Sequence, residues 1–555
     1  MSQPRIFPVV LLTLSVFVQA EPMPNSGSQI QQLPPALNLK QPAPTVESKH
    51  IAVSAIAAAE STGIVVNTLK IIDAQIFTDS ELVAVSGFNS GNRYSIEDLR
   101  DMAVKISGHY HSNGYFVALA FLPPQQINAG EVSIKVIEGR YGKIALHNQS
   151  HLSDSLANSF LVGLNSGDIV SSAPLEQRLL LLSDLPGVTI KSTLVPGASV
   201  GATDLIVDVS PARRITGSIN ADNAGNRYTG ANRVGAAVNL NDPSGRGDVV
   251  ALRVLSSGAG LRYARAAYQT QFTEVKAGVA YSHFGYTLGR EFESLHANGT
   301  AGIAGIYGSY PLLRSRQNNL YVQLAYDTKS FHDTVDATVS VTDKQARVLM
   351  FSMNGDLRDV LGGAGMNGFS FTVTTGKIDN QTPAVKSLDA LTAQTNGRFN
   401  KLGYSAMRLQ NAGESLSIYA AINGQLASKN LDVSEKMELG GMYAVRAYPE
   451  GEGFADQGYV LTLEARKQLP PVYEGASGQM QLIGFFDHGN VLLNKRHWEA
   501  GQNSRSLSGA GIGFNWSSED YWVVKAFYAH KLGNGVATSA PDSSGRFWLQ
   551  AVKYF

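Results

Sequence analysis

The sequence predicts an all-β transmembrane barrel of about 16 antiparallel strands, preceded by two small α/β domains. From about residue 211 to Phe555, apolar residues recur at every second position, which is typical of strands with one lipid-facing side. Residues 64–210 instead mix helical and strand periodicities. Charged residues make up only 16% of the chain, below the roughly 25% of an average soluble domain.

The first residues, 1–20, are predicted to be a signal peptide. Arg5 supplies the basic start, an apolar run covers 6–18, and Val18-Gln19-Ala20 has the small residues of a cleavage site. An N-terminal membrane anchor is the alternative, but the run is shorter than the roughly 20 residues that cross a bilayer. No later stretch has 18 consecutive apolar residues. If the chain lies in a membrane, it must therefore do so as a closed barrel.

Residues 21–63 are predicted to be a proline-rich linker, because their six prolines interrupt any long element. A short helix over residues 28–33 would fit the sequence and could plug the pore. A disordered spacer is equally consistent with the composition.

Residues 64–138 are predicted to form the first α/β domain. Strands are expected at 69–77, 115–122 and 132–136. Between the first two, Ser95 and Asp98 have capping-box spacing. An apolar face then follows at helical spacing, formed by Ile96, Leu99, Ala103, Ile106 and Tyr110.

Residues 139–210 are predicted to form the second α/β domain. Helices are expected at 152–164 and 175–185, followed by strands at 188–195 and 204–209. The leucine run 179–182 is interpreted as the buried face of a helix and not as a binding site.

Residues 211–555 are predicted to form the barrel. One apolar stripe holds Val275, Ala277, Val279 and Tyr281, and the positions between them are small or polar. A soluble β-sandwich also alternates, but its polar face is usually more highly charged. Spread over 16 strands, this region allows about 22 residues for each strand and connection, which suits transmembrane strands of about ten residues.

Two short motifs near the C-terminal end carry the candidate site. The first lies in a glycine-flanked loop and the second in a strand about forty residues later. A salt bridge between Arg446 and Asp487 inside the barrel would be shielded from bulk water and could fix a long loop in the pore. The motif residues are Val445, Arg446, Ala447 and Tyr448 in the loop, and Phe485, Asp487 and Gly489 in the strand.

The composition argues against other classes of function. The 45 basic and 45 acidic residues balance, which gives no indication of nucleic-acid binding. The absence of cysteine excludes disulfides, thiolate nucleophiles and cysteine-based metal sites. No Gly-x-Ser-x-Gly nucleophile motif is present, and His488 is interpreted as a lumen or packing residue. We therefore expect no enzyme, no catalytic residue, no metal and no cofactor.

Several motifs resemble those of the TpsB transporters of two-partner secretion, relatives of the BamA-like assembly factors. The similarity runs from about residue 64 to the C-terminus. It covers the ends of two POTRA (polypeptide-transport-associated) domains, an opening barrel hairpin and the approach to the arginine loop. The segments are Leu122-Pro123-Pro124-Gln125, Val136-Ile137-Glu138-Gly139, Asp184-Leu185-Pro186-Gly187, Asp222-Asn223-Ala224-Gly225, Tyr228-Thr229-Gly230 and Leu439-Gly440-Gly441. The family's loop motif is usually Val-Arg-Gly-Tyr, and here Ala447 stands at the glycine position.

The resemblance implies an outer-membrane transporter of a Gram-negative bacterium with its POTRA domains in the periplasm. These domains would recognise the N-terminal secretion domain of one large exoprotein, which the barrel would pass to the cell surface without nucleotide hydrolysis. The client could be an adhesin, a haemolysin, a contact-dependent toxin or a haem-acquisition protein. Other expected partners are outer-membrane lipid and the barrel assembly machinery, which would read the terminal Phe555 as an insertion signal. Lys553 departs from that signal.

Three alternatives remain at this point. A BamA-like assembly factor would share the arginine loop but commonly has more POTRA domains than residues 64–210 can hold. A small-solute porin would not explain the POTRA-like region. An outer-membrane enzyme would need a catalytic motif.

Overall fold

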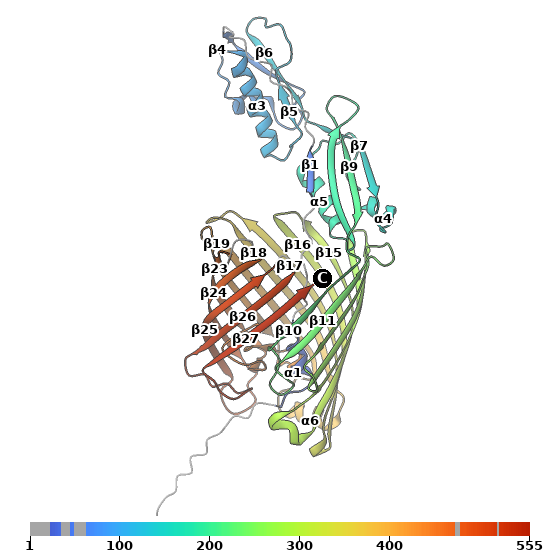
Figure 1. Cartoon of the computed structure of the whole chain (residues 1–555), viewed down its shortest axis with the longest axis vertical. Helices are drawn as coiled ribbons and strands as arrows, with labels where there is room; N and C mark the ends of the chain where they lie inside the picture. The colour runs from blue at the N-terminus through green and yellow to red at the C-terminus, as the bar shows by residue number, and fades with distance from the viewer. Residues whose placement is uncertain (1–22, 35–44, 49–62, 472–477, 519–520) are drawn as a thin grey trace, which may run out of the picture.

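A computed structural model describes residues 23–34, 45–48, 63–471, 478–518 and 521–555. Two small α/β domains stand in a row at one end of a large β-barrel (Figure 1). Among these residues, no helix combines the length and apolarity needed to cross a membrane. The predicted signal peptide, 1–20, lies outside the described residues.

Among the described residues, sixteen antiparallel strands close the predicted barrel. Neighbours in sequence pair throughout, and β10 pairs with β27 through Ser218–Asp222 against Tyr554–Gln550 to close it. The strands are β10 (Ile215–Asp222), β11 (Arg233–Asn241), β12 (Val249–Ser256), β13 (Leu261–Phe272), β14 (Val275–Thr287), β15 (Ala297–Arg314), β16 (Asn318–Val335), β17 (Ser340–Asp359), β18 (Gly365–Asn380), β19 (Gly397–Asn411), β20 (Leu416–Ala427), β23 (Gln457–Leu469), β24 (Gln479–Leu492), β25 (Ser504–Ser517), β26 (Trp522–Leu532) and β27 (Gly545–Tyr554).

Shorter elements lie in the connections and in the lumen. Strands β21 (Met437–Glu438) and β22 (Phe454–Ala455) form a two-stranded sheet of their own, so β20 pairs directly with β23. The helices are α1 (Ser26–Gln31), α6 (Pro383–Leu391) and the 3₁₀ turns η1 (Arg290–Leu295), η2 (Asp336–Thr338) and η3 (Val433–Glu435). Helix α1, in the region where a short helix was expected, lies inside the barrel (Figure 1).

The apolar stripes predicted from the sequence face outward. Val279 and Tyr281 of β14 are 52% and 54% exposed, and Leu324 and Tyr326 of β16 are similarly exposed. A soluble protein would bury these side chains, whereas lipid solvates them. This arrangement confirms a lipid-facing barrel and argues against the β-sandwich.

The first α/β domain packs its helices on a three-stranded sheet of order β3-β6-β5. The capping box of Ser95 and Asp98 begins the long helix, as its spacing predicts. The strand expected at 69–77 ends early, because Asp73 adopts a left-handed conformation with φ of 66°. The elements are β2 (Ile64–Val66), β3 (Thr68–Ile72), α2 (Asp79–Ser86), β4 (Asn92–Tyr94), α3 (Ile96–Ser112), β5 (Leu119–Phe121) and β6 (Glu131–Ile137).

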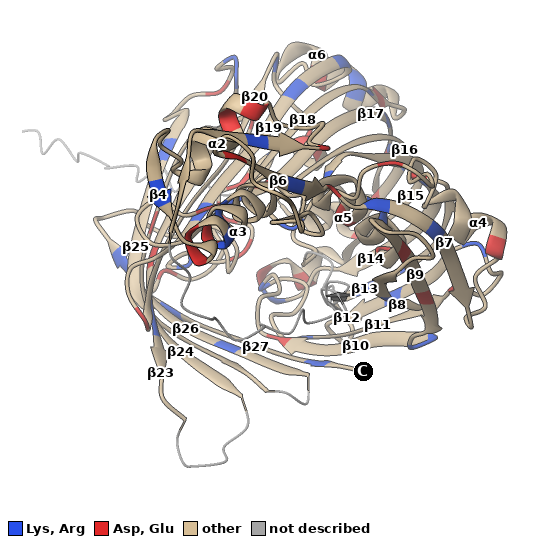
Figure 2. Cartoon of the chain, turned by 90° about the horizontal axis from the view of Figure 1, so that it is seen from above, with Lys and Arg blue, Asp and Glu red and all other residues tan. Residues whose placement is uncertain are grey.

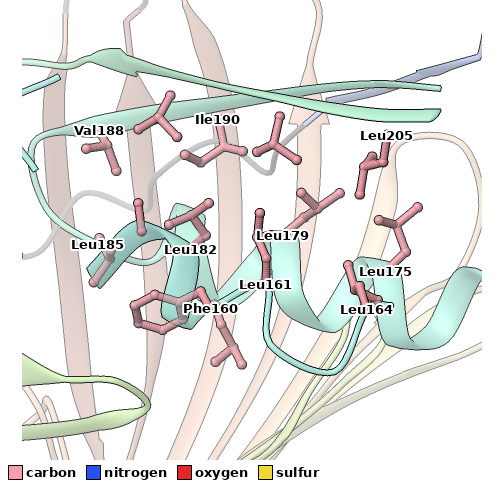
Figure 3. Close-up of a cluster of buried hydrophobic side chains, with 14 of the residues drawn as sticks. Phe160, Leu161, Leu164, Leu175, Leu179, Leu182, Leu185, Val188, Ile190 and Leu205 are labelled. Carbon is pink, nitrogen blue, oxygen red and sulfur yellow. The ribbon is translucent and has the colours of Figure 1, made fainter. Parts of the chain in front are cut away.

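The second α/β domain has a sheet of order β1-β8-β9-β7. Strand β1 comes from the proline-rich segment and pairs in parallel with β8. Leu179 and Leu182 are fully buried between helix and sheet, as the interpretation of the leucine run requires (Figure 3). The elements are β1 (Thr45–Ser48), β7 (Arg140–Asn148), α4 (Asp154–Ser159), α5 (Ser172–Ser183), β8 (Val188–Pro196) and β9 (Ala202–Pro211).

Replacing Leu179 by alanine should destabilise this domain strongly. Leu179 is 0% exposed, and truncating a buried leucine costs about 2–5 kcal/mol. We expect a loss of that size in the free energy of unfolding of purified residues 64–210, measured by denaturant titration with circular dichroism. Val162→Ala is the control, because Val162 is 68% exposed. Equal losses for the two variants would contradict this packing.

Ion pairs fix the second domain against the barrel turns that face it. Arg314 at the end of β15 donates from Nε and Nη2 to the Asp184 carboxylate at 2.7 and 2.8 Å. Arg178 contacts Glu274 at 2.5 Å. Elsewhere, basic and acidic residues are interspersed over the domains and the barrel (Figure 2). The domain is therefore held at the barrel entrance by specific pairs and not by a surface of one charge.

Candidate functional site: a loop folded into the barrel

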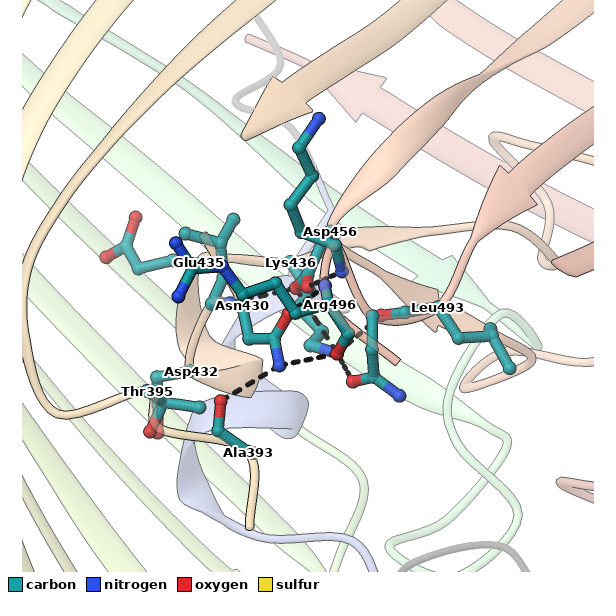
Figure 4. Close-up of polar contacts among 12 residues, drawn as sticks. Ala393, Thr395, Asn430, Asp432, Glu435, Lys436, Asp456, Leu493 and Arg496 are labelled. Atoms are coloured by element: carbon teal, nitrogen blue, oxygen red, sulfur yellow. Dashed lines mark hydrogen bonds and ion pairs between the residues drawn. The ribbon is translucent and has the colours of Figure 1, made fainter. Parts of the chain in front are cut away.

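The connection between β20 and β23, residues 428–456, folds into the barrel, and a polar network fixes its base (Figure 4). Asn430 donates from Nδ2 to the carbonyl oxygens of Ala393 and Arg496, both at 2.9 Å. The buried Asp456 carboxylate accepts from the backbone N–H groups of Leu431 and Lys495. Each arm of the loop is therefore tied to neighbouring extracellular connections.

The first arm of the loop also contacts the barrel wall at strands β16, β17 and β19. Lys344 of β17 donates to Asp432 at 2.8 Å. Glu435 in η3 pairs with Lys329 of β16 at 2.6 Å and Lys401 of β19 at 3.0 Å. These pairs tie the loop to a part of the wall separate from β24.

The tip of the loop is joined to the wall by Arg446. Its Nε and Nη2 donate to the two oxygens of Asp487 on β24, each at 2.8 Å, and its backbone N–H donates to Asp487 at 3.1 Å. The third guanidinium nitrogen, Nη1, donates to Glu464 on β23 at 2.8 Å. This forked arrangement matches carboxylate geometry and fixes both the position and the direction of the arginine.

The surroundings of the guanidinium exclude water. Arg446 is 5% exposed and Asp487 is fully buried. The guanidinium carbon lies 3.6 Å from the ring centroid of Phe485 and 5.1 Å from that of Phe527. Burial alone would lower the pKa of Arg446, but the hydrogen bonds and charges of Asp487 and Glu464 raise it above its usual value. The loop tip therefore stays charged and bound to its partners.

The residues flanking Arg446 pack on the same wall. Val445, Ala447 and Tyr448 are fully buried. The Tyr448 hydroxyl donates to the Gly535 carbonyl at 3.0 Å, and Lys531 lies 4.6 Å above its ring. Trp548 of β27 donates its indole N–H to the Arg446 carbonyl at 2.7 Å. The motif thus reaches five successive strands, β23 to β27, and their connections.

Two glycines of the wall make room for the loop. A Cβ at Gly489 would lie 2.3 Å from Leu439 and 3.2 Å from Val445, which explains the glycine in the strand motif. A Cβ at Gly509 of β25 would lie 2.4 Å from the Ala447 Cβ. Ala447 does not adopt positive φ, so alanine is accommodated where the family usually has glycine.

The C-terminal strand meets β10 at its end. Phe555 and Gly217 exchange two backbone hydrogen bonds at 3.1 Å. Phe547 and Leu549 face outward, as does Phe555. Lys553, the departure from the insertion pattern, places its ammonium 5.4 Å from the Trp522 ring centroid, where a lysine can cover an aromatic surface.

Sequence reasoning identified Arg446 and Asp487 but missed other members of the site. Glu464 was detectable, because a lone glutamate stands on the lumen side of the apolar alternation in β23. Glu452 is 0% exposed and accepts hydrogen bonds from the backbone N–H groups of Thr538 and Ser539 at 3.0 and 2.9 Å. No local motif marks Glu452, because its side-chain partners are 53 to 87 residues away.

The site has the features of an anchor. His488 contacts the Ser508 hydroxyl at 2.9 Å and stacks with Phe486, which agrees with a packing role. No cluster of three or more metal-ligating side chains occurs within the described residues. The arrangement can hold a loop in a pore.

Comparison with known proteins agrees with this architecture. Residues 201–516 match the family described as haemolysin secretion/activation protein ShlB/FhaC/HecB, and residues 64–139 match the POTRA domain, ShlB-type. The heme/hemopexin transporter protein HuxB of Haemophilus influenzae is 29% identical over 87% of this chain and 85% of its own length. The outer membrane transporter CdiB of Dickeya dadantii is 22% identical over 76% of this chain and 74% of its own length.

Solved structures share the fold. CdiB from Escherichia coli superposes with a TM-score of 0.68 at 17% identity, covering 91% of this chain and 93% of its own. BamA from Haemophilus ducreyi gives a TM-score of 0.54 at 13% identity, covering 89% of this chain and all of its own. The family match spans more than half of the sequence. The chain therefore belongs to the haemolysin secretion/activation protein ShlB/FhaC/HecB family, the outer-membrane transporters of two-partner secretion.

Proposed function

We propose that this transporter secretes one large exoprotein, and that the loop anchored by Arg446 organises the pore for it. The barrel lies in the outer membrane with its POTRA domains in the periplasm. The observation that carries the proposal is the forked, buried contact of Arg446 with Asp487 and Glu464. It holds a long loop at a defined place in a lumen through which an extended chain would pass without nucleotide hydrolysis.

We propose further that the client is of the haem-acquisition type. HuxB, a heme/hemopexin transporter, matches this chain at higher identity and over a larger share than the CdiB relatives do. An adhesin, a haemolysin or a contact-dependent toxin would be the other outcome. Haem binding by the exoprotein encoded next to this gene, measured by absorption spectroscopy, distinguishes these clients.

The POTRA domains would select the client through a free sheet edge. In the second domain the edge strands are β1, which covers β8, and β7. In the first domain β3 and β5 are the edges. A client strand can add to such an edge through backbone hydrogen bonds, and neighbouring side chains then supply specificity.

Purified residues 64–210 should therefore bind the N-terminal secretion domain of the cognate exoprotein. The two α/β domains have hydrophobic cores formed entirely within this range, so the fragment should fold without the barrel. Calorimetric titration measures the binding, and Leu179→Ala serves as a destabilised-fragment control. A folded fragment that fails to bind, alongside a full-length protein that binds, would refute this assignment.

The C-terminal strand supports a proposal for the biogenesis partner. Its outward aromatic residues and terminal Phe555 support recognition by the barrel assembly machinery, with Lys553 tolerated over Trp522. The assembly-factor alternative is weaker, because the likeness to BamA extends to the fold alone at 13% identity.

A further inference from the structure

Helix α1 is held in the lumen by polar contacts, and Ile30 and Leu33 also pack against the apolar cluster of the barrel wall. It lies beside β14, β15 and β16 (Figure 1). Its buried residues include Ser26, Ser28 and Gln29, and Asn25 and Ser28 form its capping box. Buried polar groups are costly unless they are hydrogen-bonded. The partners of these groups therefore define what keeps the helix in place.

One anchor lies at the beginning of the helix. Asp333 of β16 accepts hydrogen bonds from the backbone N–H and the hydroxyl of Ser26, both at 2.8 Å. Tyr286 of β14 donates to the same carboxylate at 2.8 Å. This anchor belongs to the long strands of the barrel wall.

The other anchor is the first barrel hairpin, residues 222–233. Thr229 donates to the Gln29 side chain at 2.8 Å. Arg233 donates from Nη1 to the Gln32 carbonyl, just past the end of the helix, at 2.9 Å. Its Nε donates to Asp222 at 2.8 Å, directly across the hairpin. The sequence motif that marks this hairpin thus supplies Asp222 and Thr229. Thr229 binds α1 directly, and Asp222 orients the arginine that binds it.

The hairpin arginine is deeply buried. Arg233 is 2% exposed, and the side chain of Asp222 is fully covered. A buried charge needs its partners, because solvent cannot replace them. The guanidinium therefore joins the helix end to the hairpin, and moving α1 away would remove one of its few acceptors.

The pore loop reaches the same place. A Cβ at Gly451 would lie 3.2 Å from Gln32 Nε2 and 2.8 Å from Asn226 Nδ2. Gln31 of α1 also donates to the Ser434 carbonyl of the loop. Helix, hairpin and pore loop therefore meet at the C-terminal end of α1.

We propose that Arg233, oriented by Asp222, is the latch that retains α1 in the lumen, and that the hairpin is the receptor for this helix. The inference rests on the proposed transport function, since α1 in the lumen obstructs an extended client. Only residues 212–214 separate β9 of the periplasmic domain from β10, whose last residue is Asp222. If that domain moves when the client binds, β10 would transmit the movement directly to Asp222 and so to Arg233.

Conductance of the full-length protein in planar lipid bilayers tests the latch. Arg233→Ala should raise the fraction of time in the open state by about tenfold, the factor that corresponds to losing one hydrogen bond to a charged group. The matched control is Arg227→Ala, because Arg227 lies in the same hairpin but pairs with Glu291. Wild-type conductance in Arg233→Ala, or equal opening in the control, would overturn the latch.

A second variant covers the case in which Arg233→Ala fails to assemble. Thr229→Val removes the bond to Gln29 and leaves the Asp222–Arg233 pair intact, so a smaller rise in open time is expected. Unchanged conductance in this variant would count against the hairpin as receptor.

Labelling tests the position of the helix without any transport assay. The chain has no cysteine, so Ile30→Cys in α1 gives a single reactive site. A bulky soluble maleimide should modify it faster in the Arg233→Ala background than in the Arg227→Ala background. Equal rates would overturn the proposal. Conductance and labelling need no client, so a failure of secretion alone would refute the proposed function and leave the latch standing.

Discussion

Arg446→Ala should abolish secretion while the barrel still assembles. Breaking a buried pair by removing one partner costs about 3–5 kcal/mol, which lowers the equilibrium constant for the bound position of the loop by roughly 10²- to 10⁴-fold. The barrel loses little, because backbone pairing among sixteen strands and the lipid-facing band hold it together. We expect exoprotein in the medium to fall by at least about tenfold, with normal heat-modifiable migration of the barrel on a gel.

Three variants delimit this result. Asp487→Ala should give the same defect, because it leaves Arg446 buried without its main partner. Arg446→Lys should also fail in large part, since lysine cannot reproduce the forked contact. Arg408→Ala is the matched control: Arg408 pairs with both oxygens of Asp359 near the periplasmic end, away from the loop. Normal secretion by both Arg446→Ala and Asp487→Ala would refute the role of the pair in secretion. Loss of the folded barrel in these variants would show that the pair is needed for folding.

Gly509→Ala should impair secretion almost as strongly, and Ala447→Gly should restore it. The new methyl would lie 2.4 Å from the Ala447 Cβ, and a Cβ attached to the backbone has no rotamer that avoids the clash. The loop must therefore lift from β25. Removing the Ala447 methyl in the double variant removes the clash and leaves Arg446 with its partners.

Gly484→Ala is the control for this experiment, because a Cβ there meets nothing within 4 Å. Secretion is measured as exoprotein in the medium for the two single variants, the double variant and the control. Wild-type secretion by Gly509→Ala, or a double variant as defective as the single one, would show that the loop is not seated on this strand.

Much of the fold could be predicted because it depends on local patterns. The alternation around Val279 and Tyr281 indicates a lipid-facing strand without knowledge of its neighbours, and Ser95 with Asp98 marks a helix start within four residues. Strand ends were less accurate: the strand expected to reach Phe77 stops at Ile72, because the left-handed turn at Asp73 has no glycine or asparagine to announce it.

The remainder of the site depends on contacts between distant segments. Arg446 and Asp487 stood out as single charges in recognisable motifs. Arg233 did not, because its role depends on Gln32, some 200 residues earlier. Glu452 is similar, since its partners lie in β25 and in the β26–β27 connection. Only the closed barrel brings these residues together.

The central claim, that this chain carries one large exoprotein across the outer membrane, is tested most directly by co-expression. The exoprotein encoded beside the gene is produced in a Gram-negative host with or without this chain, and extracellular exoprotein is quantified. We predict exoprotein in the medium or on the cell surface only when the chain is present, and periplasmic retention and degradation when it is absent. Equal amounts outside the cell in both strains would contradict the account.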